Sequence, residues 1–159
     1  MSKAIISTRH GDITLEFLPE IAPLHVENFL ELAKSGFYDK TLFHRVIPDF
    51  MIQGGDPNSK DADKRLHGTG GSGKNLKAEF SDTPHVRGIL SAARSASPNS
   101  ASSQFFIVVK DSPHLNKQYT AFGRVTEGLD VVDKIVAEES DHRDNPLEAV
   151  EITVKVVED

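Results

Sequence analysis

The chain has 159 residues, of which 38% are hydrophobic and 26% charged, a composition that predicts one compact globular domain over residues 1–159. With 18 basic and 24 acidic residues the net charge is −6, which argues against a nucleic-acid partner, and no apolar run is long enough to span a membrane. Cysteine is absent and the N-terminus lacks the apolar core of a secretory signal, so we expect a cytoplasmic protein without disulfides.

The first third of the chain predicts a hairpin followed by a helix. Strand-like residues 4–8 and 13–17 flank Gly11, which can adopt the positive φ of a tight turn. A helix is expected to begin at Pro23 and to end at Gly36. Its apolar stripe has helical spacing and consists of Val26, Phe29, Leu30 and Ala33.

The rest of the chain predicts short strands and one more helix. Strand-like apolar runs occupy residues 42–47, 50–52, 88–93, 105–109 and 121–125. A second amphipathic helix follows Gly128, and residues 150–157 alternate as a terminal strand does. Seven or eight strands with two helices favour a mainly β fold, a barrel or sandwich capped by helices. The expected core consists of Ile6, Ile13, Leu15, Phe29, Ile89, Phe105, Ile107, Val132, Ile135 and Val154.

Two glycine-rich motifs and the histidines suggest chemistry only weakly. Residues 68–73 fit a dinucleotide fingerprint, and 68–74 fit the start of a P-loop, but Asn75 stands where a P-loop needs Ser or Thr. The flanks lack the required strand and helix, and the long polar stretch 56–77 shows no helical stripe, so a glycine-rich turn is favoured. The seven histidines show no metal-ligand spacing and favour scattered surface positions, and no serine has the context of a hydrolase nucleophile. We therefore expect no metal and no cofactor.

Polar residues interrupt an apolar segment between residues 43 and 56. Arg45 and Gln53 lie on strand-like pieces that a Pro-Asp turn separates. An arginine among apolar neighbours either extends to water or points into a concave site, and spacing alone leaves both interpretations open. His44 would point to the opposite face of the strand, which favours a supporting role.

The segment 43–56 resembles the signature of the cyclophilins, a family of peptidyl-prolyl cis-trans isomerases, and the pattern is most similar to bacterial cyclophilins. Further segments agree in order, namely the glycine loop 67–71, the strand pair 88–93 and 103–107, and the strand 119–125. The similarity covers nearly the whole chain. It implies a closed eight-stranded antiparallel β-barrel capped by two α-helices.

The resemblance also implies roles for single residues. Arg45 would be the catalytic arginine and Gln53 its hydrogen-bonding partner in the groove. Substrate would contact Phe50, Met51, Ala93, Gln104, Phe106, Leu115 and Tyr119. The partners would be proline-containing peptides and unfolded or folding proteins, and the protein would act as a monomer.

Three features differ from the cyclosporin-binding eukaryotic members. The loop 94–97 is one residue longer, the loop 57–65 is also longer, and His114 stands where those members have tryptophan. Because imidazole replaces the indole poorly, we expect weak cyclosporin binding. A proline-peptide binding module or scaffold with little turnover is the alternative function, although the presence of both Arg45 and Gln53 favours an isomerase.

Overall fold

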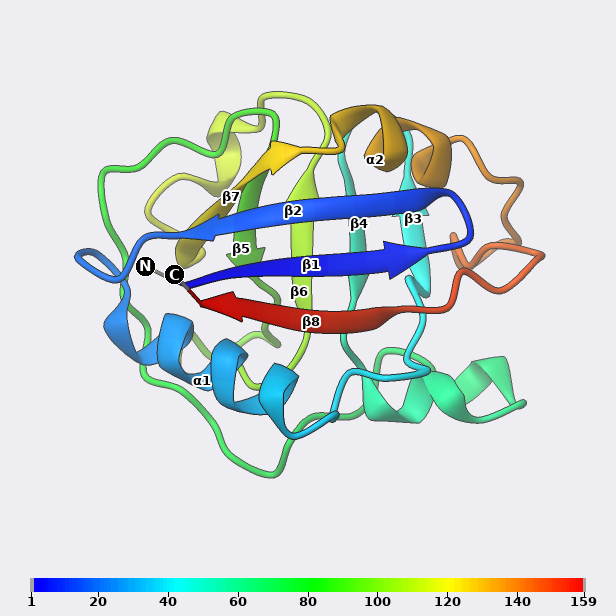
Figure 1. Cartoon of the computed structure of the whole chain (residues 1–159), viewed down its shortest axis with the longest axis horizontal. Helices are drawn as coiled ribbons and strands as arrows, with labels where there is room; N and C mark the ends of the chain where they lie inside the picture. Colours follow the sequence, from blue (N-terminus) through cyan, green and yellow to red (C-terminus); the bar gives the residue numbers. More distant parts are fainter. Residues whose placement is uncertain (1, 159) are drawn as a thin grey trace.

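Eight antiparallel strands form one sheet that curls into an open half-barrel in the computed structural model, which describes residues 2–158 (Figure 1). The strand order is β3-β4-β6-β5-β7-β2-β1-β8. The strands are β1 (Ser2–Thr8), β2 (Gly11–Phe17), β3 (Arg45–Ile47), β4 (Met51–Gly54), β5 (Ile89–Ala92), β6 (Phe105–Val108), β7 (Ala121–Glu127) and β8 (Thr153–Glu158). The mainly β prediction and the terminal hairpin are therefore confirmed.

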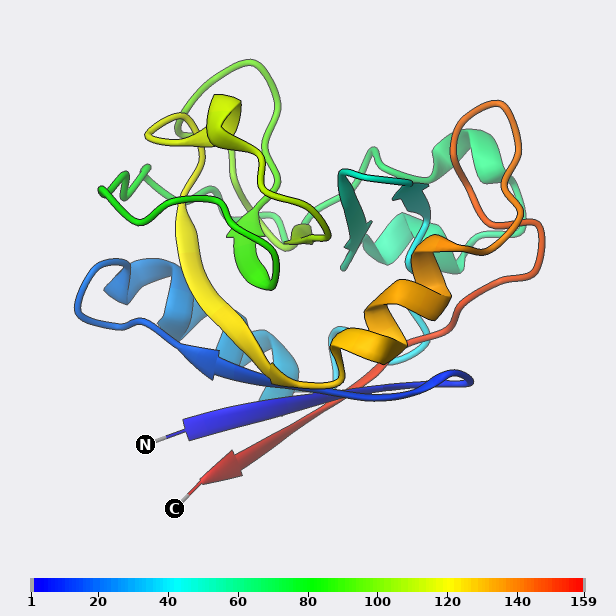
Figure 2. The ribbon, with the colours of Figure 1, turned by 90° about the horizontal axis from the view of Figure 1, so that it is seen from above.

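The prediction of a closed barrel is wrong. Within residues 2–158 no ladder joins the edge strands β3 and β8, and the curl stays open (Figure 2). The chain segments that precede these strands do meet, through a single bridge between Leu42 and Glu151 and backbone bonds between residues 40–43 and 150–152. Beyond that point the backbone N–H of Val46 donates to the carbonyl of Asp144 at 2.7 Å. A loop, rather than β8, thus occupies the outer edge of β3.

Two helices pack against the sheet, as predicted. Helix α1 (Pro23–Lys34) begins at its proline and ends before Gly36, whose φ is +79°. Helix α2 (Leu129–Val136) follows Gly128. A side chain at Gly128 would collide with the carbonyl oxygen of Asp12, so the close approach requires glycine. In the described part of the chain, no helix combines the length and apolar character that crossing a bilayer demands.

The core is centred on the ring of Phe29 from α1. Its centroid lies 5.0 Å from that of Tyr38 and 5.4 Å from those of Phe17 and Phe105. All ten predicted core residues are buried. Nine belong to this central cluster, whereas Ile89 belongs to a second apolar cluster on the other face of β4, β5 and β6. The central strands of the sheet are therefore buried on both faces.

Three predicted segments differ in detail from the structure. Of the strand-like run 42–47 only Arg45–Ile47 forms a strand, β3. The polar stretch 56–77 contains two short 3₁₀ turns, η1 (Pro57–Lys60) and η2 (Lys64–Leu66). The last strand begins at Thr153 rather than at Val150, because Val150 and Ile152 bond to residues 40–43 instead of to β1. Alternation of apolar residues indicates an extended segment but does not identify its partner.

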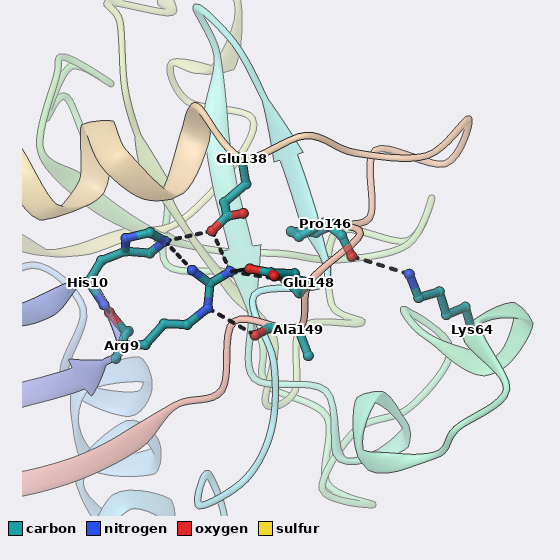
Figure 3. Close-up of polar contacts among 8 residues, drawn as sticks. Arg9, His10, Lys64, Glu138, Pro146, Glu148 and Ala149 are labelled. Carbon is teal, nitrogen blue, oxygen red and sulfur yellow. Dashed lines mark hydrogen bonds and ion pairs between the residues drawn. The ribbon is translucent and has the colours of Figure 1, made fainter.

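A charged cluster fastens the turn between β1 and β2 to the C-terminal region (Figure 3). The Arg9 guanidinium pairs with Glu138, just beyond α2, and donates to the backbone carbonyls of Glu148 at 3.3 Å and Ala149 at 3.4 Å. His10 Nε2 lies 2.6 Å from the same Glu138 carboxylate. Burial raises the pKa of Glu138, but the hydrogen bonds from His10 and Arg9 outweigh it, so the pKa lies below its usual value. The cluster therefore joins the turn to two segments that lie 129 and 139 residues further along the chain.

His44 is buried and Arg45 is exposed, which confirms that they point to opposite faces. Only 5% of His44 is accessible, and its Nδ1 has no hydrogen-bond partner. Burial lowers the pKa of His44 to about 4, although the nearby Asp56 carboxylate acts in the opposite direction. The folded protein therefore holds this imidazole neutral.

We predict that stability falls as the pH drops from about 6.5 to about 4. Over that interval the unfolded chain binds a proton at His44 while the folded chain does not, which disfavours folding by about 3 kcal/mol at the lower end. His44→Gln should remove most of this loss. Urea unfolding at several pH values measures the effect, with the exposed His142→Gln as the control. An unchanged pH dependence in His44→Gln would contradict the assignment.

Candidate functional site

A hollow of about 210 Å³ with an apolar floor and a polar rim, which we call the apolar hollow, lies on the outer face of β4, β5 and β6, above the second apolar cluster. Residues from β3, β4, β6, η3 (Pro113–Leu115) and the loops after β5 and η3 converge on it. It is lined by Arg45, Phe50, Met51, Gln53, Ala93, Arg94, Phe106, Leu115 and Tyr119. All of these except Arg94 are residues that the resemblance implies for the site, and the structure brings them together from segments separated by more than 70 residues.

Arg45 and Gln53 face each other across the β3–β4 hairpin. They are register partners, and Arg45 Nη1 donates to Gln53 Oε1 at 3.2 Å. The next pair, Val46 and Ile52, is fully buried in the central core. Alternation along both strands thus directs the polar pair to the hollow. Of the two interpretations of Arg45, the structure supports the concave site.

The floor of the hollow is formed by Met51, Phe106 and Leu115, none of which is more than 5% exposed. Tyr119 stands at the edge, with its ring perpendicular to that of Phe106 at a centroid separation of 5.8 Å. Phe50 is half-buried and also lines the hollow. A small apolar ring can lose its water shell in such a site while polar groups at the rim fix its orientation.

His85 supports the floor from behind and was missed by the sequence analysis. Its ring stacks on that of Phe106 at 6.3 Å, and its Nε2 lies 2.9 Å from the Ser91 hydroxyl. Burial lowers the pKa of His85 and keeps the imidazole neutral. His25, His44 and His85 are each at most 5% exposed, so the expectation of scattered surface histidines is wrong for these three. A histidine that packs against an apolar ring has no characteristic sequence spacing.

His114 and Gln104 lie beside the apolar hollow rather than in it. The His114 ring, in η3, packs on Phe50 at a centroid distance of 5.6 Å. Gln104 accepts a hydrogen bond from Gln53 Nε2 at 2.9 Å, and its own Nε2 donates to the carbonyl of Gly70 at 2.9 Å. Gln104 therefore connects the polar pair to the glycine-rich loop.

A second, polar hollow of about 490 Å³ adjoins the first. Gln53, Ala93 and Arg94 line both. The remaining residues of the polar hollow are Gly68, Thr69, Gly70, Gly71, Gly73, Asn75, Ser95, Ser100, Ser102 and Gln104. Its walls are thus glycines, hydroxyls and amides, a surface suited to a polar peptide or side chain.

Asp56 holds the glycine-rich loop in place. Its fully buried carboxylate accepts hydrogen bonds from the backbone N–H groups of Asn58, at 2.9 Å, and Gly68. The loop follows a 3₁₀ turn and leads into a single bridge between Leu76 and Ala101, not into a helix. The structure therefore shows neither a P-loop nor a dinucleotide fold here.

Comparison with known proteins gives a consistent result. Residues 3–156 match the model of the family described as "Cyclophilin type peptidyl-prolyl cis-trans isomerase/CLD". A probable peptidyl-prolyl cis-trans isomerase of Brucella abortus is 49% identical over 136 residues, 82% of this chain and 69% of that protein. A peptidyl-prolyl cis-trans isomerase of Schizosaccharomyces pombe is 42% identical and covers 96% of each chain.

Two solved structures are also similar. A cyclophilin-type isomerase of Cryptosporidium parvum, crystallised in the presence of the dipeptide Ala-Pro, has a TM-score of 0.89 and 32% identity over 99% of both chains. A bacterial cyclophilin of Hirschia baltica has a TM-score of 0.78 and 25% identity over 98% of this chain and 73% of that one. Fold and sequence thus agree over nearly all of the chain.

Gly70→Ala should destabilise the loop beside the polar hollow by about 1–3 kcal/mol, because the new methyl group would collide with the buried Asp56 carboxylate. Gly71→Ala is the matched comparison and should cost less, since its methyl group would meet only the Ser102 side chain, whose hydroxyl at 2.8 Å can rotate and whose Cβ at 3.0 Å needs a small shift. Urea unfolding followed by circular dichroism measures both. Equal stability losses would show that Asp56 does not constrain the loop.

Proposed function

Because the chain belongs to the cyclophilin-type peptidyl-prolyl cis-trans isomerase family, we propose that its apolar hollow binds the proline ring of an X-Pro peptide and that Arg45 accelerates rotation about the X-Pro bond. The observation that carries the proposal is the position of a hydrogen-bonded arginine–glutamine pair at the edge of a small apolar hollow. The related Cryptosporidium structure in the presence of Ala-Pro supports the choice of ligand.

The physical problem in this reaction is kinetic. The two isomers of an X-Pro bond differ by only about 0.5–1 kcal/mol, but amide resonance imposes a barrier of about 18–20 kcal/mol between them. In the twisted transition state the proline nitrogen regains its lone pair. A donor that bonds to this nitrogen stabilises the transition state more than either planar ground state.

Arg45 suits this task because its guanidinium stays charged and presents several N–H donors. Gln53 holds Nη1, and Gln104 in turn holds Gln53, so the guanidinium is oriented before substrate arrives. Because the fold already fixes this orientation, no free energy is spent on orienting the guanidinium when the transition state forms. The reaction makes and breaks no covalent bond, so the proposed mechanism needs no nucleophile.

The size of the rate enhancement requires more than one stabilising interaction in the transition state. Raising the rate from roughly 10⁻² per second to about 10² or 10³ per second takes about 5–7 kcal/mol of transition-state stabilisation. One charge-assisted hydrogen bond contributes about 1.5–3 kcal/mol. We assign the remainder to the anchoring of the ring by Phe50, Met51, Phe106 and Leu115 and to polar groups around the twisting carbonyl.

The alternative is a module that binds proline peptides, or a scaffold, with little turnover. The same apolar floor would hold a proline ring without accelerating anything. A pre-oriented Arg45 favours catalysis, because binding of an uncharged ring does not require a fixed cation beside it. As partners we propose proline-containing segments of unfolded or folding proteins. We also propose that the protein is a monomer and that it is cytoplasmic; the cytoplasmic location is in line with the absence of cysteine.

Replacing Arg45 should separate rate from affinity. We expect Arg45→Ala to lower the rate of isomerisation by about 30- to 1,000-fold, which corresponds to about 2–4 kcal/mol for one pre-oriented charged donor. Affinity for a proline peptide should fall much less, since the apolar floor remains. Arg45→Lys should recover little activity, because an ammonium cannot contact both the nitrogen and Gln53 as a planar guanidinium does.

Exchange spectroscopy by NMR on a short X-Pro peptide gives turnover, and a titration gives affinity, after circular dichroism has established that each variant is folded. Turnover near that of the unmodified protein in Arg45→Ala would rule out the mechanism. Equal losses of rate and affinity would reduce Arg45 to a binding residue and favour the alternative.

Cyclosporin should bind weakly, and His114→Trp should strengthen its binding. An indole beside Phe50 would add apolar contact area and an N–H donor at the edge of the hollow. The measurement is the inhibition of peptide turnover by cyclosporin, for the unmodified protein and for His114→Trp. His142→Trp is the control, because it introduces a tryptophan at an exposed position elsewhere. Inhibition of the unmodified protein at concentrations that suffice for drug-sensitive cyclophilins would contradict this prediction, as would an unchanged response in His114→Trp.

A further inference from the structure

Arg94 lies on the ridge between the two hollows. It is one of the three residues that line both, and the other two, Gln53 and Ala93, are uncharged. The resemblance assigned it no role, and the sequence placed it only in a lengthened serine-rich loop. A peptide whose proline ring fills the apolar hollow and whose neighbouring residue enters the polar hollow crosses the boundary that these three residues form.

The guanidinium of Arg94 is held in one place by uncharged partners. It lies over the Tyr119 ring, with the central carbon 4.5 Å from the ring centroid. Nε and Nη2 donate to the carbonyl of Gln118 at 3.0 and 2.8 Å, and Nη1 donates to the carbonyls of Ser95 at 2.9 Å and Ala96 at 3.4 Å. These hydrogen bonds use at most four of the five N–H groups of the guanidinium, so at least one N–H group is left for a ligand.

The charge of Arg94 is not compensated within the protein. Among residues 2–158 the structure records no ion pair for Arg94, Arg45 or Arg143, whereas each of the other arginines pairs with a carboxylate, namely Arg9, Arg65, Arg87 and Arg124. The residues that line the two hollows include two cations, Arg45 and Arg94, and no carboxylate. In a protein of net charge −6 this is a local reversal of sign, and it would attract an anionic group.

We propose that Arg94 is a specificity-determining residue that selects peptides with an anionic side chain close in sequence to the isomerised proline. The proposal rests on the function proposed above, because it requires the proline ring to occupy the apolar hollow. A guanidinium fixed on an aromatic ring and on carbonyls binds a carboxylate or phosphate without first losing side-chain freedom. Both anions have the same chemistry toward Arg94, and they are distinguished by experiment.

The test uses short peptides with a single proline in which one of the flanking positions carries Glu, Gln or phosphoserine. For the unmodified protein at low salt, we expect kcat/KM to be about 3- to 10-fold higher for Glu than for Gln at one or more of these positions, a size typical of one oriented, solvent-accessible ion pair. The ratio should fall at high salt. A larger preference for phosphoserine than for Glu would identify phosphate as the better ligand, and the reverse would identify carboxylate.

Three variants test whether the preference for Glu over Gln depends on Arg94. Arg94→Gln should bring the Glu-to-Gln ratio close to one, and Arg94→Lys should retain part of it. Lys155→Gln is the matched control: it removes the same charge from an exposed position on β8, a strand that lines neither hollow, and should leave the ratio unchanged. Circular dichroism establishes that each variant is folded.

A ratio near one at every position in the unmodified protein, or a ratio that survives in Arg94→Gln, would overturn the inference. Failure of the proposed function is recognised separately, because then no peptide would be isomerised faster than in buffer. In that case dissociation constants for the same peptides, from NMR titration, give the Glu-to-Gln ratio directly and decide the role of Arg94 without any turnover.

Discussion

The site depends on the burial of strands β4 and β6 on both faces. Along β4, Ile52 enters the central core while Met51 and Gln53 face the hollow, and along β6 Phe105 and Phe106 divide in the same way. Because side chains alternate with a period of two, a shift of one residue would exchange core and site. The packing around Phe29 and Phe105 on the inner face therefore also fixes where Gln53 and Phe106 stand on the outer face.

A chain of polar contacts then joins the two hollows into one surface. Arg45 bonds to Gln53, Gln53 to Gln104, and Gln104 to the carbonyls of the glycine-rich loop, which Asp56 holds from below. Each group is fixed by its neighbour, so the guanidinium is oriented by a network that begins at a buried carboxylate. The proposed chemistry at Arg45 uses this network, whereas Arg94 is held separately, over the Tyr119 ring and by the carbonyl of Gln118.

Much of this could be predicted from the sequence because it depends on local spacing or on a resemblance. The hairpin, both helices and the ten core residues follow from periods of 2 and 3.6. The residues that line the apolar hollow follow from the resemblance. The closed barrel that the resemblance implies is wrong, because closure depends on which backbone group binds the outer edge of β3, and a loop carbonyl at Asp144 does so. Partners of that kind leave no pattern in the sequence.

The sequence by itself determined which residues share a face of each strand and helix, because the direction of a side chain follows from its position in a local period of 2 or 3.6 residues. Only the tertiary structure decided that His85 lies buried behind Phe106 and that Arg94 stands over Tyr119 without a carboxylate partner. The reason is physical: burial, compensation of charge and the shape of a hollow are properties of groups brought together from distant segments. Residues 85, 94, 106 and 119 acquire their roles only when the segments before and after β5 and the loop after η3 meet over the sheet.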